Sequence, residues 1–234
     1  MMASLEVLPL HLSTVTFPDF HPLAGQTGDV LGFAVRHATG VALFDTGIGD
    51  GSSLIDRYYE PVRRSLADAL AAHGHELADV TDVVNSHLHF DHCGNNPLLP
   101  GIPIFVQEVE LAAARTEPHY TVPDWVDFPG AEYRVLDGET MVRPGIRIIT
   151  TPGHTRGHQS VVLDDGHDRP VVLAGQAIYT RAEYEHVAAH GTPLPLGDDI
   201  PPPDPTSVAS AQRLIDLRPR RVHFSHDVDV WTDD

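Results

Sequence analysis

Residues 87–92 read His-Leu-His-Phe-Asp-His and carry four potential metal ligands, His87, His89, Asp91 and His92. A helix would spread these side chains around its circumference, and a strand would place His92 on the face opposite the other three. A sharp loop at the end of a strand can gather all four. The alternative is a polar surface loop that holds three of the chain's 16 histidines by chance.

Two other predicted strands also end in histidine-bearing loops. Residues 146–150 lead into Thr-Pro-Gly-His154, and residues 221–225 lead to His226. Neutral imidazole and carboxylate are the usual ligands of zinc, and two ions need about seven or eight donors between them. These loops therefore predict a metal site, although ligands of this kind also accept iron, cobalt or manganese.

Charge and composition restrict the partners of the chain. The formal net charge of -18 disfavours nucleic acid and anionic membranes, so a small molecule is the expected partner, and the oligomeric state stays open. Cys93 is the only cysteine, and its place beside the cluster predicts a buried, inert thiol. With no signal peptide or membrane-length apolar run recognisable, we expect one cytoplasmic domain over residues 1–234.

The rest of the chain reads as a layered α/β protein. We expect helices over residues 53–73, which Pro61 could divide, over 107–115, and over 207–217 with Thr206 or Ser207 as its cap. The aromatic segment 116–130 is either a lid or an ordinary packed loop, and the proline-rich segment 191–205 is a crossing linker. Strands are expected at residues 5–16, 32–35, 41–44, 80–85, 102–106, 133–136, 141–142, 146–150, 161–163, 171–174 and 221–225.

These motifs together resemble the metallo-β-lactamase superfamily, which implies a four-layer αβ/βα sandwich with a metal site along one sheet edge. Details such as Gly157-His-Gln-Ser160 and Ser225-His-Asp227 look similar to the N-acyl homoserine lactone lactonases. The resemblance implies one zinc ion on His87, His89 and His154, and a second on Asp91, His92 and His226. It also implies that a metal-activated water opens the lactone ring.

Further roles follow from the same resemblance. Tyr179 matches a tyrosine that stabilises the oxyanion, and Phe90 matches an apolar residue of the substrate pocket. Spacing alone favours a packed aromatic residue at Tyr179, and the resemblance reverses that preference, whereas Phe90 could simply pack within its loop. Asp45 ends the strand over residues 41–44 and either orients a metal-bound histidine or forms an Asx turn, whereas His158 is expected to support the site without binding metal.

Gln176 departs from the family pattern, because lactonases carry an aspartate that bridges both ions at the matching position. A neutral amide oxygen neither cancels the cationic charge nor bridges as a carboxylate does. Three alternatives stay open: a dinuclear site with a weak second ion, a mononuclear site in which Asp91 acts as general base, or a binding protein without turnover. Thioester hydrolysis is the runner-up among enzymatic activities, and β-lactam cleavage ranks lower.

Overall fold

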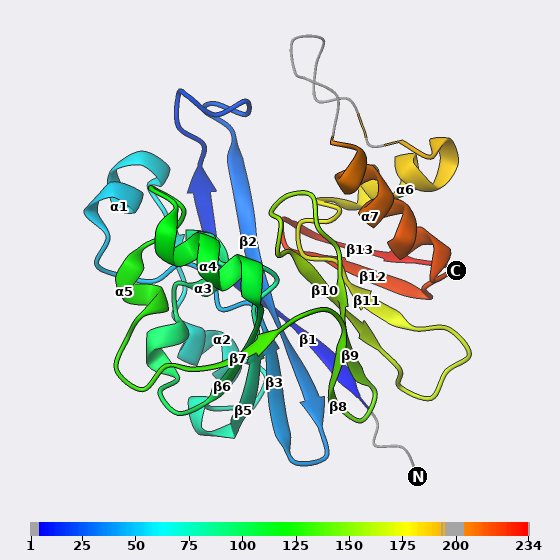
Figure 1. The fold of residues 1–234 in the computed structure, drawn as a ribbon, viewed down its shortest axis with the longest axis horizontal. Coiled ribbons are helices and arrows are strands. Elements are labelled where there is room, and N and C mark those ends of the chain that lie inside the picture. The colour runs from blue at the N-terminus through cyan, green and yellow to red at the C-terminus, as the bar shows by residue number, and fades with distance from the viewer. Residues whose placement is uncertain (1–4, 193, 195–203, 234) are drawn as a thin grey trace.

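The computed structural model describes residues 5–192, 194 and 204–233. Two β-sheets face each other and helices cover the outer face of each, so the layers run helix, sheet, sheet, helix (Figure 1). The expected αβ/βα sandwich is confirmed. Most of the predicted linker over residues 191–205 lies outside the described residues.

The first sheet has the strand order β4-β1-β2-β3-β5-β6-β7 within the described residues. The strands β1 to β3 are antiparallel neighbours, whereas β3, β5, β6 and β7 run parallel. The bounds are β1 (Glu6–Thr16), β2 (Thr27–His37), β3 (Gly40–Phe44), β4 (Val62–Arg63), β5 (Val80–Val84), β6 (Pro103–Gln107) and β7 (Glu132–Leu136).

The second sheet has the order β13-β12-β11-β10-β9-β8, and only β11 and β12 pair in parallel among the described strands. The bounds are β8 (Thr140–Arg143), β9 (Ile146–Thr150), β10 (Gln159–Leu163), β11 (Val171–Leu173), β12 (Arg221–Phe224) and β13 (Asp227–Thr232). We did not predict β13, because aspartates at alternate positions weaken its apolar pattern. Trp231 of this strand nevertheless packs against the core of the second sheet.

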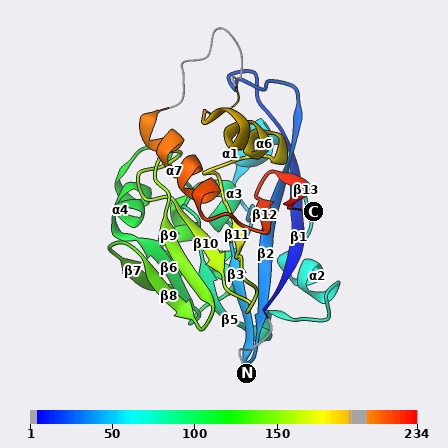
Figure 2. The same ribbon diagram turned by 90° about the vertical axis from the view of Figure 1, so that its right-hand side faces the viewer.

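Alternating side chains along the strands build three apolar layers. Val84 of β5 points between the sheets, where it joins Phe33 and Leu173, while its neighbour Val83 points outward to Leu70. The helices beyond the first sheet are α1 (Ser53–Tyr59), α2 (Leu66–Ala71), α4 (Glu108–Thr116) and α5 (Pro123–Val126), with 3₁₀ turns η1 (Leu77–Asp79) and η2 (Asn96–Leu98). The helices α6 (Arg181–His190) and α7 (Pro205–Asp216) cover the second sheet (Figure 2).

The helices differ from the predictions in three details. The segment 53–73 divides at Pro61, as expected, into two short helices separated by β4, but α1 buries no residue, so Leu54 and Tyr58 are exposed. The cap of α7 is Asp204, whose carboxylate accepts the Thr206 amide, because Pro205 at the first helical position moves the start upstream. We missed α6, whose charged sequence has only Tyr184 and Val187 buried.

The topology brings several strand ends to one edge of the sandwich. The chain leaves β5, β9, β11 and β12 there, just before the predicted ligand loops. Backbone hydrogen bonds join the two sheets at this edge, from Gln159 to Ser86 and from Leu31 to Ser225. Both sheets therefore determine the position of the loops between them.

Candidate metal centre

The loop after β5 places its four candidate ligands with two kinds of backbone. His87 lies in irregular chain, and His89, whose backbone is extended, is the N-cap of the one-turn helix α3 (Phe90–Cys93), which carries Asp91 and His92. The expected sharp loop therefore holds His87 and His89, and a short helix holds Asp91 and His92. The helical turn redirects the chain so that the last two side chains face a different point from the first two.

The first trio, His87, His89 and His154, converges on one point. The Nε2 atom of His154 lies 3.1 Å from Nε2 of His87 and 3.1 Å from Nδ1 of His89. For Zn–N bonds of about 2.0–2.1 Å, two ligands of a tetrahedral ion are about 3.3 Å apart. The three nitrogens thus have the spacing of ligands to one small cation.

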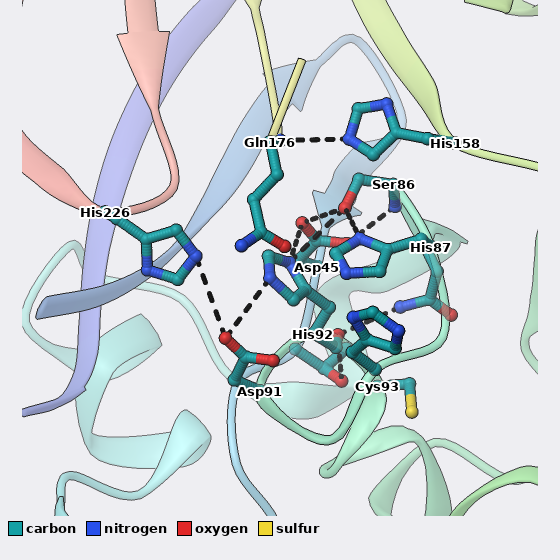
Figure 3. Close-up of polar contacts among 12 residues, drawn as sticks. Asp45, Ser86, His87, Asp91, His92, Cys93, His158, Gln176 and His226 are labelled. Atoms are coloured by element: carbon teal, nitrogen blue, oxygen red, sulfur yellow. Dashed lines mark hydrogen bonds and ion pairs between the residues drawn. The ribbon is translucent and has the colours of Figure 1, made fainter. Parts of the chain in front are cut away.

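The second trio, Asp91, His92 and His226, is more open. The Oδ2 atom of Asp91 lies 3.4 Å from Nε2 of His92 and 3.7 Å from Nε2 of His226 (Figure 3). Both Nε2 atoms are buried without a hydrogen-bond partner. Leaving such an atom unsatisfied costs about 1–3 kcal/mol, and a cation between the three side chains would satisfy both rings. The donor set and the unpartnered atoms fit a divalent metal.

The opposite nitrogen of four of these rings has a partner. The Nδ1 atom of His92 bonds Oδ2 of Asp45 at 2.8 Å, and Nδ1 of His87 faces Oγ of Ser86 at 3.0 Å. The Nδ1 atoms of His154 and His226 face the Tyr179 hydroxyl at 2.7 Å and the backbone carbonyl of Asp29 at 2.8 Å. Such bonds fix the tautomer that leaves Nε2 free for a metal.

Asp45 lies fully buried at the end of β3, with φ of 61°. Its carboxylate accepts hydrogen bonds from the Ser86 amide at 2.7 Å and the Ser86 hydroxyl at 2.8 Å, in addition to the His92 ring. Both partners lie in the segment that follows the next parallel strand, β5. The position therefore connects Asp45 to the candidate ligands and not to its own turn.

Two glycines let the Asp45 loop and the His92 loop cross. A Cβ atom on Gly94 would lie 2.0 Å from the Gly49 nitrogen, and one on Gly49 would lie 2.1 Å from the Gly94 carbonyl oxygen. The Gly94 amide donates to the Gly47 carbonyl at 2.8 Å. Backbone thus packs directly on backbone beneath the second trio.

Burial and neighbouring charges set the protonation of the rings. Burial, with nearby histidines, lowers the pKa of His87 and of His154, so both are neutral and able to bind metal. Burial also opposes the charged form of His92, but Asp91 and Asp45 outweigh it and raise the pKa of His92 to about 10. A metal ion at the second trio must therefore displace a proton from His92.

His158 and Gln176 meet at the end of β11. His158 is buried, and its Nδ1 faces the Thr151 carbonyl at 3.0 Å. Its Nε2 accepts a hydrogen bond from the backbone amide of Gln176 at 2.9 Å. Both ring nitrogens are used, which leaves none for a metal. The Gln176 side chain points toward the space between His226 and His92, and its Oε1 is buried without a partner (Figure 3).

Tyr179 contacts ligands of both trios, and Phe90 lies in the ligand loop itself. The Tyr179 ring stacks near His226, with centroids 6.0 Å apart, and the residue is 38% exposed. Phe90 is half-buried and its ring contacts Tyr59 at 4.6 Å. Cys93 is fully buried, as expected, and burial raises the pKa of its thiol to about 12.

A cavity of about 350 Å³ opens beside the first trio, with His89 and His154 in its wall. Tyr120 from the aromatic segment lines it, whereas Trp125, Val126 and Phe128 of the same segment are buried. The segment 116–130 therefore packs three side chains into the interior, while Glu117 and Tyr120 line the cavity.

Sequence reasoning missed Glu110, which lies in the first turn of α4 and is buried. Its carboxylate accepts from the Leu88 amide and the Thr155 hydroxyl, next to three candidate ligands. An acidic residue in a first helical turn is common, so nothing in the sequence distinguishes Glu110 from an ordinary residue of a helix start.

Similar proteins support this picture. The model of the metallo-beta-lactamase superfamily matches residues 26–226. An N-acyl homoserine lactonase from a Bacillus species is 31% identical over 159 residues, which is 67% of this chain and only 59% of that protein. The lactonase AttM from Agrobacterium fabrum is 27% identical over 226 residues, covering 85% of this chain and 82% of its own length.

A solved structure shows the same fold. The chain matches a mutant of the lactonase AiiA from B. thuringiensis, with N-decanoyl-L-homoserine bound at its active site, with a TM-score of 0.74 and 24% identity. The match covers 97% of this chain and 95% of the other. No helix among the described residues is long and apolar enough to cross a membrane. The extent of the family match, together with this fold, shows that the chain belongs to the metallo-β-lactamase superfamily.

Proposed function

We propose that this chain is a metal-dependent hydrolase that opens a lactone ring, with N-acyl homoserine lactones as the first substrate class to test. One observation carries the proposal: two ligand trios lie side by side, each with ring nitrogens aimed at a common point. The relatives named above are lactonases.

The proposed ligands are the two trios, with zinc as the preferred ion. Divalent ions bound there would supply Lewis acidity and lower the pKa of a water molecule. Asp91 is a proposed ligand of the second ion, and where only the first trio holds an ion it is instead the candidate general base. His92 and His226 keep Asp91 ionised against the opposing effect of burial, and the bound ion would supply the rest of the driving force by lowering the pKa of water. The Oδ atoms of Asp91 can accept a proton from the attacking water.

Tyr179 is the proposed oxyanion donor. In the tautomer of His154 that carries its proton on Nδ1, this N–H donates to the Tyr179 oxygen. The phenolic O–H of Tyr179 can then point to the ester oxygen. Loss of solvent around the hydroxyl raises the pKa of Tyr179, which keeps this proton in place at neutral pH. Donors of this kind stabilise a tetrahedral oxyanion.

Asp45 and His158 are proposed to orient the site, and Phe90 to line the substrate pocket. Because each sheet contributes ligands to both sides of the centre, we propose that residues 1–234 act as one unit. A small molecule remains the proposed partner, and a cytoplasmic location is consistent with the single buried thiol.

A substrate panel tests the proposal directly. Acid release would be measured for lactones of several ring and acyl sizes, for a thioester and for a β-lactam, with and without added zinc. We expect zinc-dependent opening of at least one lactone, with the thioester cleaved more slowly.

The control variants are His87→Ala and His154→Ala, which remove one ligand each. Turnover that survives either change would contradict the metal assignment. Binding of lactones without turnover by the wild-type chain would instead support a binding protein on this fold.

A further inference from the structure

Glu110 lies where the two loops of the first trio approach α4. The residue is 1% exposed, in the first turn of α4, and the helix directly follows β6. Burying a carboxylate is unfavourable unless hydrogen bonds or charges compensate it. No lysine or arginine forms an ion pair with Glu110 among residues 5–192, 194 and 204–233.

Three donors from three different segments satisfy the carboxylate. Its Oε1 accepts the Leu88 backbone amide at 2.8 Å and the Tyr120 hydroxyl at 2.5 Å, and its Oε2 accepts the Thr155 hydroxyl at 2.7 Å. These bonds involve an ionised acceptor, so they are stronger than bonds between neutral groups.

Each donor is adjacent to a ligand of the first trio. Leu88 lies between His87 and His89, and Thr155 directly follows His154. The Tyr120 ring contacts the His89 ring, with centroids 4.8 Å apart. Through these neighbours, one carboxylate connects all three ligands of the first trio and contacts none of them directly.

Close packing reinforces the connection. A Cβ atom on Gly157 would lie 2.4 Å from Cβ of Glu110, so the His154 loop rests directly on the first turn of α4. A side chain at position 157 would separate the two.

Charge gives the position a second consequence. The first trio consists of three neutral imidazoles, so it provides no anionic ligand to a divalent ion. Glu110 places a carboxylate beside this trio, joined to its loops through the Leu88 amide and the Thr155 hydroxyl. An ion bound there would compensate the unpaired buried carboxylate.

We propose that Glu110 is a positioning residue that fixes the spacing of His87, His89 and His154 before metal binds, and so makes the first trio the tighter site. The inference rests on the metal centre of the proposed function. It concerns ion affinity alone and does not depend on which substrate is cleaved.

The experiment measures zinc binding to the full chain by competition with a chromophoric chelator. All variants are made in the His226→Ala background, which cuts the second trio and leaves the first one whole. Cobalt replaces zinc in a parallel series, because its absorption spectrum reports ligand geometry at the first trio. Neither readout requires turnover.

We expect Glu110→Gln to weaken zinc binding at the first trio by about tenfold or more, as loss of orienting groups around a ligand commonly does. Thr155→Val should weaken it by about three- to tenfold, whereas Thr155→Ser, which keeps the hydroxyl, should stay close to the parent. The cobalt spectrum should change with Thr155→Val and not with Thr155→Ser.

Asp82→Asn is the matched control. Asp82 is also a buried carboxylate, but it lies within β5, where it accepts hydrogen bonds from Arg143 and Thr81 and from no residue of the ligand loops. Its loss should reduce stability and leave zinc affinity unchanged. Equal zinc affinity in Glu110→Gln and its parent would overturn the inference, as would a Thr155→Val protein that binds like Thr155→Ser.

The proposed function can fail separately. A wild-type chain that binds zinc tightly but opens no lactone refutes the lactonase activity and leaves the role of Glu110 standing. If Glu110→Gln does not fold, the Thr155→Val and Thr155→Ser pair decides the question.

Discussion

The two ligand trios differ in how their side chains are held. The first trio consists of neutral rings with His154 only 3.1 Å from its two partners, and its loops meet on the Glu110 carboxylate. In the second trio, the Asp91 carboxylate lies 3.4 and 3.7 Å from the Nε2 atoms of His92 and His226. Asp45 bonds the opposite nitrogen of the His92 ring. One site is organised by geometry and the other by charge.

The difference teaches how the Gln176 departure affects the centre. Asp91 and Asp45 raise the pKa of His92 to about 10 against the opposing effect of burial. A cation at the second trio therefore competes with a proton for His92, and Gln176 offers only a neutral oxygen in support. We therefore expect unequal affinities, with the second ion the weaker one.

Removing one ligand from each trio gives the largest expected contrast. His154→Ala should reduce kcat/KM by about a thousandfold or more and abolish tight binding of one ion, since Lewis-acid stabilisation is worth several kcal/mol. His226→Ala should lose the weaker ion and retain the tight one. Metal content after dialysis and initial rates measure both, and the same loss in both variants would show that the trios are equivalent.

Gln176→Asp should strengthen the second site. A carboxylate in place of the amide adds a negative charge next to the cation, which should raise second-ion affinity by about a hundredfold. Metal per chain would be counted after dialysis at low free zinc. One ion in the wild type and two in the variant support the expectation, and two ions in both would refute a weak second site.

Asp45→Asn should affect the second trio alone. The amide keeps the size but loses the charge that faces His92, so second-ion affinity should fall by about ten- to a hundredfold. Chelator competition measures it, with Asp82→Asn as the control for loss of a buried carboxylate. A first ion that loosens as much as the second would contradict the separation of the trios.

His223 is a buried histidine outside both trios, and we expect it to affect stability and not metal binding. Both of its ring nitrogens lack hydrogen-bond partners, and burial, together with Arg221, lowers its pKa to about 4. The unfolded chain takes up this proton as pH falls below about 6.5, and the folded chain does so only near pH 4. Stability should therefore fall through that window.

The pH effect can be measured with His223→Leu. Between pH 7.5 and 5.0 the wild type should lose about 2 kcal/mol more unfolding free energy than the variant. Urea unfolding at the two pH values measures this. An identical pH dependence in both proteins would show that His223 carries a hydrogen-bond partner or a proton in the folded state.

The strands and the ligand loops were predictable because their signals are local. The apolar runs of β5 and β9 give strands at nearly the predicted bounds, and histidines directly after strand ends have few structural explanations. The fold and its family are confirmed. The roles of the ligands, Tyr179 and Gln176 stay predictions.

What the sequence could not provide depends on distant contacts. In the sequence, Glu110 is an ordinary acidic residue in the first turn of a helix. Its hydrogen bond with the Thr155 hydroxyl, 45 residues later in the chain, appears only in the fold. Similarly, the backbone carbonyl of Asp29 faces His226 across 197 residues, and no side-chain pattern marks a carbonyl. The helix α6 was missed because most of its surface is solvated and leaves only a short apolar signal.

The crossing of Gly49 and Gly94 limits how this protein can be altered by selection. With main chain on main chain, no larger residue can enter either position without moving the loop that carries His92. New specificity must then come from elsewhere, such as Ala113 and Tyr120 in the wall of the cavity. Mutations at those positions can change substrate choice, whereas mutations at the two glycines are expected only to disturb the fold.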